Sequence, residues 1–345
     1  MIEIRLANHW DSTKSDDHFE MSVYHSLEWR KTISVGFGGK WVFIIAAIKG
    51  DDVAVIPLLF KKYNLLECLG SPLRGTFSLY MGPGFKKHLS KGMKGSILKE
   101  IVSFLGRLKY DLIEIVVAAE TINLNDMSDC LEKNGFSIST VPSLEVDLSV
   151  GKQAVWEKME GRARTAIRKA EKNRVSIESK LFNIHESNNL YIMLSETFKR
   201  QGAELPHSNK SYTAFAENLH HKSQYIYAVA RHEDKTIACG LYLIDGKRLV
   251  FHTGANSEKG YILGASSLLK WDIFQRAIDM NLASFDFGGV GIGSIDKFKS
   301  SFGSQPILHH RLSRISKRFF LIEKIMSNKV CKKIIIKIMR RLKTI

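Results

Sequence analysis

The order of the predicted elements in the second half of this sequence constrains the fold more than any other feature. Three apolar segments with strand-like patterns follow one another, and Asp245-Gly246 between the last two is a hairpin signal. A loop over residues 255–263 leads to a long helix and then to an apolar strand that ends at Gly288-Gly289. The predicted strands and helix cover, in order, residues 224–231, 236–244, 248–254, 264–280 and 283–287. This order predicts a mixed α/β fold with a mixed central sheet flanked by helices.

The first half of the sequence repeats this order in a degenerate form. A hairpin around Lys49-Gly50-Asp51 is followed by a loop rich in Gly and Pro, a helix and a buried, β-branched strand. These segments are residues 40–49, 52–60, 65–84, 93–108 and 110–118. Residues 110–114 (YDLIE) and 282–286 (LASFD) occupy corresponding places. We therefore expect two similar domains, residues 1–143 and 144–312, followed by a tail over residues 313–345.

The sequence between the two repeats predicts a further set of elements. A short helix over residues 125–134 ends before Gly135, a residue that commonly terminates helices. The pattern then predicts two separate strands, one continuous helix, another strand and an amphipathic helix. They cover residues 136–140, 144–148, 152–174, 176–182 and 188–200.

The net charge of +16 is concentrated in two segments. Residues 313–345 contain 11 basic residues and one acid, and residues 161–180 contain seven basic residues and two acids. The other 292 residues hold 33 basic and 32 acidic residues, so the body of the chain is nearly neutral. This distribution disfavours a protein that coats nucleic acid with its whole surface, and no nucleic-acid recognition motif is readable.

The remaining composition excludes several classes of protein. The N-terminus carries no signal-peptide pattern, and the longest clear apolar run, residues 41–48, is far too short to span a membrane. Four scattered cysteines without a CxxC motif indicate a reducing cytoplasm and argue against zinc or disulfides. The histidine pairs His220-His221 and His309-His310 have no acid or Cys at ligand spacing, so we expect no metal site.

The basic segment over residues 161–174 (GRARTAIRKAEKNR) is the first candidate binding element. On a helix Arg164, Arg168 and Lys172 lie on one face, and Lys169 widens the stripe. Guanidinium groups bind phosphates in a bidentate manner, so the stripe is a candidate anion site. The alternative is a solvated helix face without a ligand.

The glycine-rich motif after the last predicted strand is the second candidate. Gly288 and Gly289 follow a buried strand directly, where glycines let a ligand approach the backbone. Lys297, Phe298 and Lys299 come soon after, and Lys299 could stabilise a developing oxyanion. The alternative is an ordinary turn in which Phe298 and Phe302 anchor the core.

The start of the predicted long helix is the third candidate. Tyr261, Gly264 and Ala265 lie where backbone N–H groups of a helix N-terminus bind phosphate or pyrophosphate. An ordinary helix cap at Ser257 or Gly264 is the alternative. No nucleophile motif, P-loop or dinucleotide fingerprint is present.

The tail over residues 315–345 is the fourth candidate. Apolar residues recur at helical spacing and Lys and Arg fill much of the rest, which is typical of a helix that lies on an anionic membrane surface. The alternative is a C-terminal helix that docks on its own domain.

Two of these motifs together resemble the FemAB-like peptidyltransferases and their acetyltransferase relatives from exopolysaccharide clusters. The first is residues 161–178 (GRARTAIRKAEKNRVSIE), and the second is residues 284–307 (SFDFGGVGIGSIDKFKSSFGSQPI). Weaker matches are residues 25–29 (HSLEW) and the segment from Ser71-Pro72 to residues 80–83 (YMGP). The order of strands, loop, helix and strand is also that of an acyltransferase of the GNAT type.

The resemblance implies tandem GNAT-like domains that transfer an acyl or aminoacyl group to an amine of a cell-envelope precursor. In Fem enzymes the donor is aminoacyl-tRNA and the acceptor is a peptidoglycan precursor. By analogy Lys299 would stabilise the tetrahedral intermediate or a terminal charge, and Arg164 and Arg168 would meet diphosphate or tRNA. The long helical arm of many Fem enzymes has no room in residues 183–224, which leaves acyl-CoA open as the donor.

We therefore expect a cytoplasmic N-acyltransferase without a tightly bound cofactor, which uses acyl-CoA or aminoacyl-tRNA as co-substrate. Its acceptor would be a peptidoglycan or surface-polysaccharide precursor, and its tail would contact the inner membrane. Lys299 and Asp286 are the candidate catalytic residues. The alternative function is a non-catalytic protein that binds anionic membrane or nucleic acid through its basic patches. The candidate residues for binding substrate or donor are Arg164, Arg168, Lys169, Lys172, Tyr261, Gly264, Ala265, Gly288, Gly289, Lys297 and Phe298.

Overall fold

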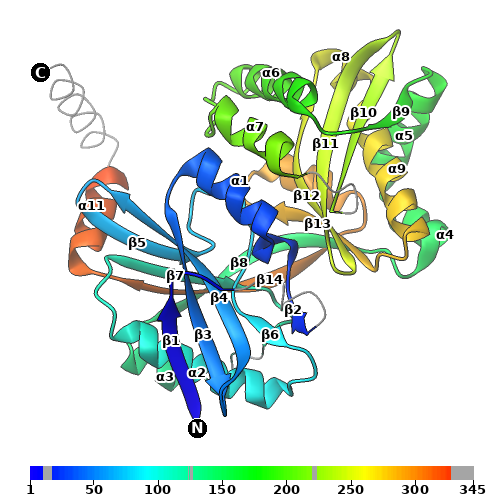
Figure 1. Cartoon of the computed structure of the whole chain (residues 1–345). Coiled ribbons are helices and arrows are strands. Elements are labelled where there is room, and N and C mark those ends of the chain that lie inside the picture. Colours follow the sequence, from blue (N-terminus) through cyan, green and yellow to red (C-terminus); the bar gives the residue numbers. More distant parts are fainter. Residues whose placement is uncertain (11–17, 123, 125–126, 220–223, 328–345) are drawn as a thin grey trace, which may run out of the picture.

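The computed structural model describes residues 1–10, 18–122, 124, 127–219 and 224–327 (Figure 1). The strands are β1 (Ile2–Ala7), β2 (Phe19–Glu20), β3 (Lys40–Ile48), β4 (Asp51–Tyr63), β5 (Leu66–Ser71), β6 (Gly84–Lys86), β7 (Leu112–Val117), β8 (Ser137–Asp147), β9 (Ser176–Lys180), β10 (Tyr225–His232), β11 (Lys235–Asp245), β12 (Arg248–Asn256), β13 (Ser284–Gly289) and β14 (Gln305–Ile315). The helices are α1 (Leu27–Phe37), α2 (Lys91–Gly106), α3 (Ser128–Lys133), α4 (Gly151–Lys158), α5 (Gly161–Lys172), α6 (Ile184–Arg200), α7 (Asn209–Asn218), α8 (Glu258–Leu263), α9 (Ala265–Asp279), α10 (Gly293–Ser300) and α11 (Lys317–Ser327).

One mixed sheet runs through the whole molecule, with β1 at one edge and β9 at the other (Figure 1). Its strand order is β1-β3-β4-β5-β7-β14-β8-β13-β12-β11-β10-β9, and the short strands β2 and β6 pair beside β4. Strand β14 comes last in the chain, but it pairs antiparallel with β7 and β8 in the middle of the sheet. The mixed α/β fold predicted from the sequence is therefore confirmed.

The two halves of the sheet repeat one topology. In each half antiparallel strands are followed by a helix that returns the chain to a parallel strand: α2 leads to β7 beside β5, and α9 leads to β13 beside β12. Residues 112–117 of β7 and 284–289 of β13 lie at a constant offset of 172 positions. Parallel pairing requires such a crossover connection, which explains why a helix precedes both strands.

Apolar side chains cover both faces of the sheet and fix the helices there. In the first half α2 and α3 pack on one face through residues such as Ile97, Ile101 and Leu131. In the second half α5 and α9 cover one face, with Ile167 and Ile273 in the core. Helices α6 and α7 cover the opposite face, and α1 of the first half packs against α7. The second face of the second half is therefore closed partly by the first half.

The structure corrects three predictions about the middle of the chain. The two strands predicted over residues 136–140 and 144–148 are one strand, β8, because pairing with β14 continues across Pro142, opposite Leu308. The single helix predicted over 152–174 is two helices, α4 and α5, because the backbone is extended at Met159 and Glu160. The predicted loop over 255–263 contains helix α8.

Both predicted domain boundaries fall inside strands. Residue 143 lies within β8 and residue 312 lies within β14. The two halves therefore share hydrogen-bonded strands at these positions, and the division into separate domains stays a prediction.

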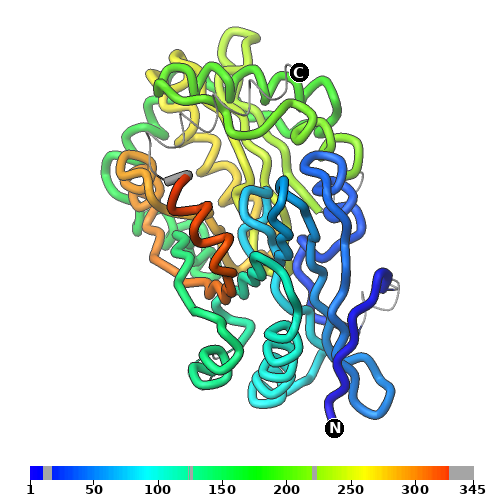
Figure 2. The backbone as a smooth tube through the Cα atoms, turned by 90° about the vertical axis from the view of Figure 1, so that its left-hand side faces the viewer, coloured from blue at the N-terminus to red at the C-terminus, as the bar shows by residue number. Residues whose placement is uncertain are grey.

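The first turns of the predicted tail dock on the body of the protein. Helix α11 packs Phe319 against the core, and Arg318 donates to Asp111 Oδ2 at 2.5 Å. Glu323 binds Arg74 at 2.8 Å. Figure 1 shows α11 on the opposite side of the molecule from α5, and Figure 2 shows α11 on the side that faces the viewer. The rest of the tail, residues 328–345, lies outside the described residues, and no helix in the described part is long and apolar enough to cross a membrane.

Candidate active site

Strands β12 and β13 pair for only three residues and then separate. The parallel pairs run from Arg248↔Ser284 to Val250↔Asp286. Beyond them residues 251–256 stay on β11, whereas Gly289 pairs with Ser143 of β8. We call the divergence of residues 251–256 from 287–289 the β12–β13 fork. The β12 edge that faces the fork has backbone N–H and C=O groups without a strand partner, and such groups can bind an extended ligand.

Local irregularities in both strands shape this fork. His252 is the extra residue of a bulge in β12, because Leu241 pairs with Thr253 and Tyr242 with Phe251. Bulges re-aim side chains and are frequent beside active sites. Gly288 has a φ of +74°, which favours glycine, and a Cβ placed there would lie 3.6 Å from Leu79 and 3.7 Å from the Phe251 carbonyl oxygen. A residue of the first half therefore reaches the base of the fork.

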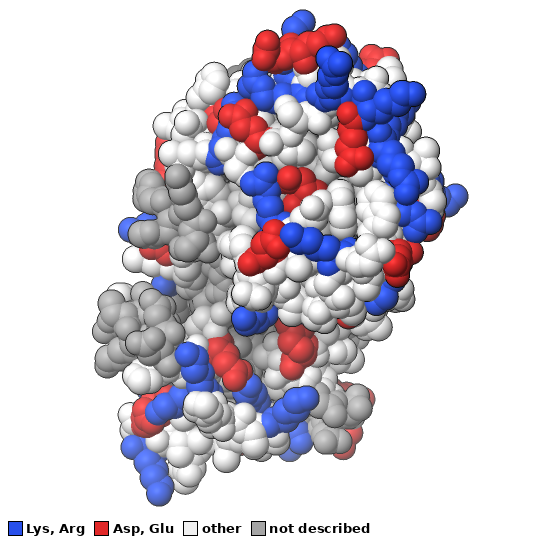
Figure 3. Space-filling model, turned by 90° about the vertical axis from the view of Figure 1, so that its right-hand side faces the viewer, with Lys and Arg blue, Asp and Glu red and all other residues white. Residues whose placement is uncertain are grey.

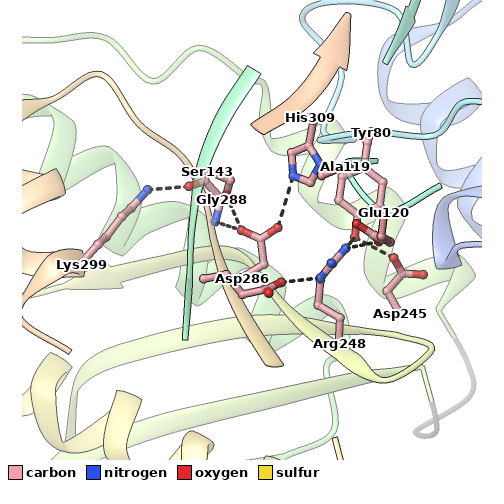
Figure 4. Close-up of polar contacts among 11 residues, drawn as sticks. Tyr80, Ala119, Glu120, Ser143, Asp245, Arg248, Asp286, Gly288, Lys299 and His309 are labelled. Carbon is pink, nitrogen blue, oxygen red and sulfur yellow. Dashed lines mark hydrogen bonds and ion pairs between the residues drawn. The ribbon is translucent and has the colours of Figure 1, made fainter. Parts of the chain in front are cut away.

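Lys299 holds the glycine turn at the base of the fork (Figure 4). Its ammonium group donates to the carbonyl oxygen of Gly288 at 3.2 Å and to that of Gly289 at 2.5 Å. The side chain reaches the turn from helix α10 and is buried. Burial lowers the pKa of Lys299, whereas Asp296 and Asp286 raise it. An ammonium group has three N–H donors, so one remains for a ligand.

Asp286 lies beneath the turn and is fully buried. Its Oδ1 accepts hydrogen bonds from the Ser143 hydroxyl and from the Gly288 N–H, the latter at 2.8 Å. Its Oδ2 lies 3.7 Å from His309 Nε2. Burial by itself raises the pKa of Asp286, but His309, Ser143 and Gly288 together lower it. Because no part of Asp286 is exposed, the geometry favours a positioning role for this candidate catalytic residue.

The ring of His309 is oriented by the first half of the chain. The backbone N–H of Ala119 donates to His309 Nδ1 at 3.3 Å, which places the remaining ring proton on Nε2, toward Asp286. The Tyr80 ring packs on the imidazole with a centroid distance of 4.8 Å. Figure 4 shows Asp286, His309 and Tyr80 side by side at the junction of the two halves.

A second polar network joins the two halves through Arg248. The guanidinium group donates to Glu145 at 2.7 Å, to Glu120 at 2.9 Å and to the Tyr80 hydroxyl at 3.1 Å. Tyr80 in turn donates to Asp245 at 2.7 Å (Figure 4). Burial alone lowers the pKa of Arg248, but Tyr80 and Glu120 raise it well above its ordinary value. The network therefore fixes the second-half hairpin against the first half.

The predicted phosphate site at the start of α9 is held close to helix α5. Gly264 has a φ of +76°, and a Cβ there would lie 2.4 Å from the carbonyl oxygen of Ala166. Only glycine allows this approach. Ala265 is buried, whereas the Tyr261 side chain is 80% exposed. The start of α9 is thus packed against α5 with Tyr261 exposed beside it, and the phosphate site there stays a prediction.

The side chains of the predicted anion-binding stripe on α5 differ in their contacts. Arg164 donates to the carbonyl oxygens of Glu157 at 3.0 Å and Met159 at 2.7 Å, so it caps the end of α4. Arg168 lies over the Trp156 ring at 5.5 Å. Lys169 and Lys172 are exposed. Figure 3 shows Lys and Arg in a row on this side of the molecule with Asp and Glu beside them. Arg164 therefore caps the end of α4 through Nη1, and its role as an anion ligand stays a prediction.

The remaining predicted residues lie on helix α10. Lys297 is exposed, and its carbonyl oxygen accepts a hydrogen bond from Arg162 at 2.6 Å. Phe298 contacts Phe302 with a ring distance of 5.2 Å and packs against the core. The structure therefore gives Phe298 the core-anchoring place that was the alternative interpretation of this motif.

Several polar residues of the site were not singled out by sequence analysis. Arg248 and Glu120 stand alone in the sequence without a motif, and Tyr80 belongs to the weakly matching YMGP segment. His309 was considered only as part of a histidine pair. Pairing between residues far apart in the chain places them together, and no local pattern reveals it. No group of three His, Cys, Asp or Glu among the described residues could hold a metal ion.

Comparison with known proteins supports the fold. Residues 157–300 match the family described as the acetyltransferase (GNAT) domain. No curated protein sequence matches the chain. The structure of FemX aligns with a TM-score of 0.68 at 13% identity, over 92% of this chain and 98% of that chain.

Two further solved structures align over most of the chain. A conserved protein of unknown function from Bacteroides thetaiotaomicron VPI-5482 has a TM-score of 0.57 at 12% identity, over 88% of this chain and 93% of that chain. L-PGS from Bacillus licheniformis has a TM-score of 0.52 at 14% identity, over 89% and 96%. Residues 157–300 therefore match a GNAT acetyltransferase domain, which supports an acyltransferase, and the chain as a whole has the overall fold of FemX.

Proposed function

We propose that this protein transfers an acyl or aminoacyl group from a CoA or tRNA donor to an amine of a cell-envelope precursor. The β12–β13 fork is the observation that carries this proposal. It offers an unpaired strand edge for an extended donor, and the glycine turn held by Lys299 lies at its base. The resemblance of the two sequence motifs to FemAB-like proteins, and the FemX-like fold, support the cell-envelope acceptor.

In the proposed reaction the neutral amine of the acceptor attacks the carbonyl carbon of the donor. A C–N bond forms, the bond to the donor's sulfur or ribose oxygen breaks, and that atom leaves with the electron pair and gains a proton. The free donor hydrogen of Lys299 stabilises the oxyanion between these steps. Asp286, which is held by Ser143 and His309, accepts a hydrogen bond from the Gly288 N–H and so positions the turn that Lys299 binds. No covalent enzyme intermediate is needed, so catalysis depends on positioning and oxyanion stabilisation.

The N-terminus of α9 is the proposed phosphate site of the donor. Its backbone N–H groups would meet the diphosphate of CoA or the phosphodiester that precedes the 3′-terminal nucleotide of tRNA. The segment 183–224 holds α6 and α7, and its described residues contain no long helical arm. For this reason we propose acyl-CoA as well as aminoacyl-tRNA as the co-substrate.

Mass spectrometry tests the proposed activity directly. The full chain is incubated with acetyl-CoA or with aminoacyl-tRNAs, together with amine acceptors from peptidoglycan and surface-polysaccharide precursors. An acceptor that gains the mass of the acyl group supports the proposal. Binding of these precursors without any acylated product would instead favour the alternative, a non-catalytic binding protein.

We also propose that the protein works in the cytoplasm at the inner membrane surface, through the tail over residues 313–345. The docked part of the tail leaves Phe320 and Leu321 more than half exposed beside basic residues. Each basic residue near an anionic leaflet contributes about 1 kcal/mol. The full chain should float with anionic liposomes, and removal of residues 328–345 should reduce flotation. Equal flotation of both forms would reject the membrane contact.

A further inference from the structure

Helix α9 buries a lysine that the proposed mechanism has not yet used. The Lys270 side chain is only 6% exposed, and its ammonium group donates to the Tyr242 hydroxyl at 3.0 Å. The same nitrogen lies 3.8 Å from the centroid of the Phe251 ring. Among the described residues no carboxylate lies within ion-pair distance of it. A buried lysine without an acidic partner is costly, which makes it a candidate for function.

Two glycines provide the room for the side chains around Lys270. Gly240 and Gly254 pair with each other across β11 and β12. A Cβ at Gly240 would lie 2.5 Å from the Tyr242 hydroxyl oxygen, and a Cβ at Gly254 would lie 3.1 Å from the Phe251 ring. The rings of Tyr242 and Phe251 therefore pack directly on the backbone of the two glycines, and the Lys270 ammonium group lies over these rings. Three elements contribute to this arrangement, so the place of the amine is well defined.

The first half of the chain supplies an internal control. Helices α9 and α2 bury residues at corresponding positions, with the same offset of 172 that relates β13 to β7. The pairs are Leu269 with Ile97, Lys270 with Leu98, Ile273 with Ile101, Phe274 with Val102 and Ala277 with Leu105. Lys270 thus corresponds to Leu98, which is fully buried. A leucine satisfies this helix position in the fold, so packing does not require the lysine.

Lys270 lies beside the fork on the side covered by α9. Phe251 is the first residue of β12 beyond the last parallel pair with β13. Lys299 reaches the fork from α10 and is near enough to disfavour the charge on Lys270. A donor whose phosphates meet the N-terminus of α9 would arrive from this same side. The leaving sulfur or oxygen would therefore lie on the Lys270 side of the carbonyl carbon.

The titratable groups that face the Lys270 amine are few. They are Tyr242 and Cys239 of β11 and Lys299 of α10, whereas α4 and α5 contribute apolar residues such as Val155, Ile167 and Ala170 to the core under α9. Burial is the largest cause that lowers the pKa of Lys270, to about 7. At neutral pH the amine can therefore both give and accept a proton.

We propose that Lys270 is the proton donor to the leaving atom of the acyl donor. As the bond from the carbonyl carbon to sulfur or oxygen breaks, the electron pair goes to that atom, which takes a proton from the Lys270 ammonium group. The neutral Lys270 amine is then protonated again by the proton released from the acceptor nitrogen, so charge and protons balance over one turnover. This inference rests on the proposed acyltransferase function.

Dependence on the leaving group tests this role. The kcat values of Lys270→Met and Lys270→Leu are compared with that of wild type for two pairs of donors. The first pair is acetyl-CoA and 4-nitrophenyl thioacetate. The second pair is aminoacyl-tRNA and the 4-nitrophenyl ester of the same amino acid. With the natural donor we expect kcat to fall by about 100-fold or more. With the aryl donor, whose leaving group needs no proton, we expect a loss of less than about tenfold. Leu98→Met is the matched control and should leave both rates unchanged.

The outcomes separate this inference from the proposed function. If wild type turns over and the Lys270 variants lose the same factor with both kinds of donor, the proton-donor role is overturned and the acyltransferase function stands. If wild type transfers no acyl group from any donor, both are overturned. A second measurement follows the lysine ¹³Cε signals of the full chain by NMR against pH. One lysine should titrate near neutrality and be missing in Lys270→Met, and titration of every lysine above pH 9 would contradict the proposal.

Discussion

The two halves of the molecule share the same arrangement of strand, helix and strand, but they differ where the two parallel strands separate. In the first half the chain fills the divergence of β5 and β7 itself. The Met81 N–H donates to the Val116 carbonyl oxygen at 3.0 Å, and the Gly82 N–H donates to the Ser71 carbonyl oxygen at 3.3 Å. In the second half no such backbone bond crosses the β12–β13 fork among the described residues. We infer that the first half supports the fold, whereas the second half leaves the fork open for the proposed site.

Corresponding residues in the two halves follow the same division. Glu114 of β7 and Asp286 of β13 are both buried, but Glu114 forms an ion pair with Arg74 at 2.8 Å, whereas Asp286 holds the glycine turn. Leu98 and Lys270 differ in the same way. Where the first half carries ordinary packing or an ion pair, the second half carries groups that can act on a ligand.

Exchange of the two helix residues should give the largest effect. Leu98→Lys would bury an unpaired charge in the first half and should lower the free energy of unfolding by about 3–5 kcal/mol. Lys270→Leu removes a buried amine and should raise it by about 1 kcal/mol while activity falls. Chemical denaturation of the full chain measures both variants. Equal destabilisation by the two substitutions would mean that Lys270 is a structural residue.

Removal of the lysine at the base of the fork should reduce turnover strongly. Lys299→Met takes away the donor near the Gly288-Gly289 carbonyl groups and should lower kcat by about tenfold or more, since oxyanion donors contribute at least this much. Lys210→Met, an exposed lysine on α7 outside the site, is the matched control with little expected change. An unchanged kcat in Lys299→Met with the true substrate would exclude its catalytic role.

Filling the fork as the first half does should impair donor binding. Gly289 corresponds to Val117 at the 172-residue offset, and a Cβ at Gly289 meets only the Pro142 carbonyl oxygen, at 3.9 Å. Gly289→Val should therefore fold normally yet raise the donor Kd by about tenfold, or 1.4 kcal/mol. Calorimetric titration with acetyl-CoA or aminoacyl-tRNA checks this. Wild-type affinity in a stably folded variant would place the donor elsewhere.

The smallest expected effect is on the stability of helix α11, which docks on the first half. The hydrogen bond from Arg318 is the largest cause that lowers the pKa of Asp111, to about 2. An unfolded aspartate has a pKa of about 3.9. The stabilisation from this contact is therefore present above that pH and is lost as the pH falls toward 2. The hydrogen-exchange protection factors of residues 317–327 should fall below pH 4, and Asp111→Asn should lower them already at pH 7.

Much of the fold and part of the candidate site were predictable from the sequence, because they depend on local patterns. The hairpin signals, the helix that precedes each parallel strand and the Gly288-Gly289 turn all come from short-range periodicity and turn residues. The correspondence of residues 110–114 with 282–286 already indicated the repeat, and Lys299 was found through its motif.

The rest depends on contacts between distant parts of the chain. Residues 136–140 and 144–148 were predicted as separate strands, although β14, more than 150 residues later, continues the pairing across Pro142. Arg164 was predicted as an anion ligand because its spacing is helical, yet the break before α5 turns it toward the end of α4. Lys270 lies in an amphipathic helix pattern where a lysine is normally exposed, and only the structure shows that it is buried.

Hydrogen exchange of the full chain, with and without acetyl-CoA or aminoacyl-tRNA, tests the central claim most directly. Ligand binding in the second half should protect residues 251–256, 287–289 and the first turn of α9 in wild type. The corresponding residues around Val116 in the first half should exchange as before. Protection confined to the first half, or protection in neither half during measured acyl transfer, would contradict the assignment of the site to the β12–β13 fork.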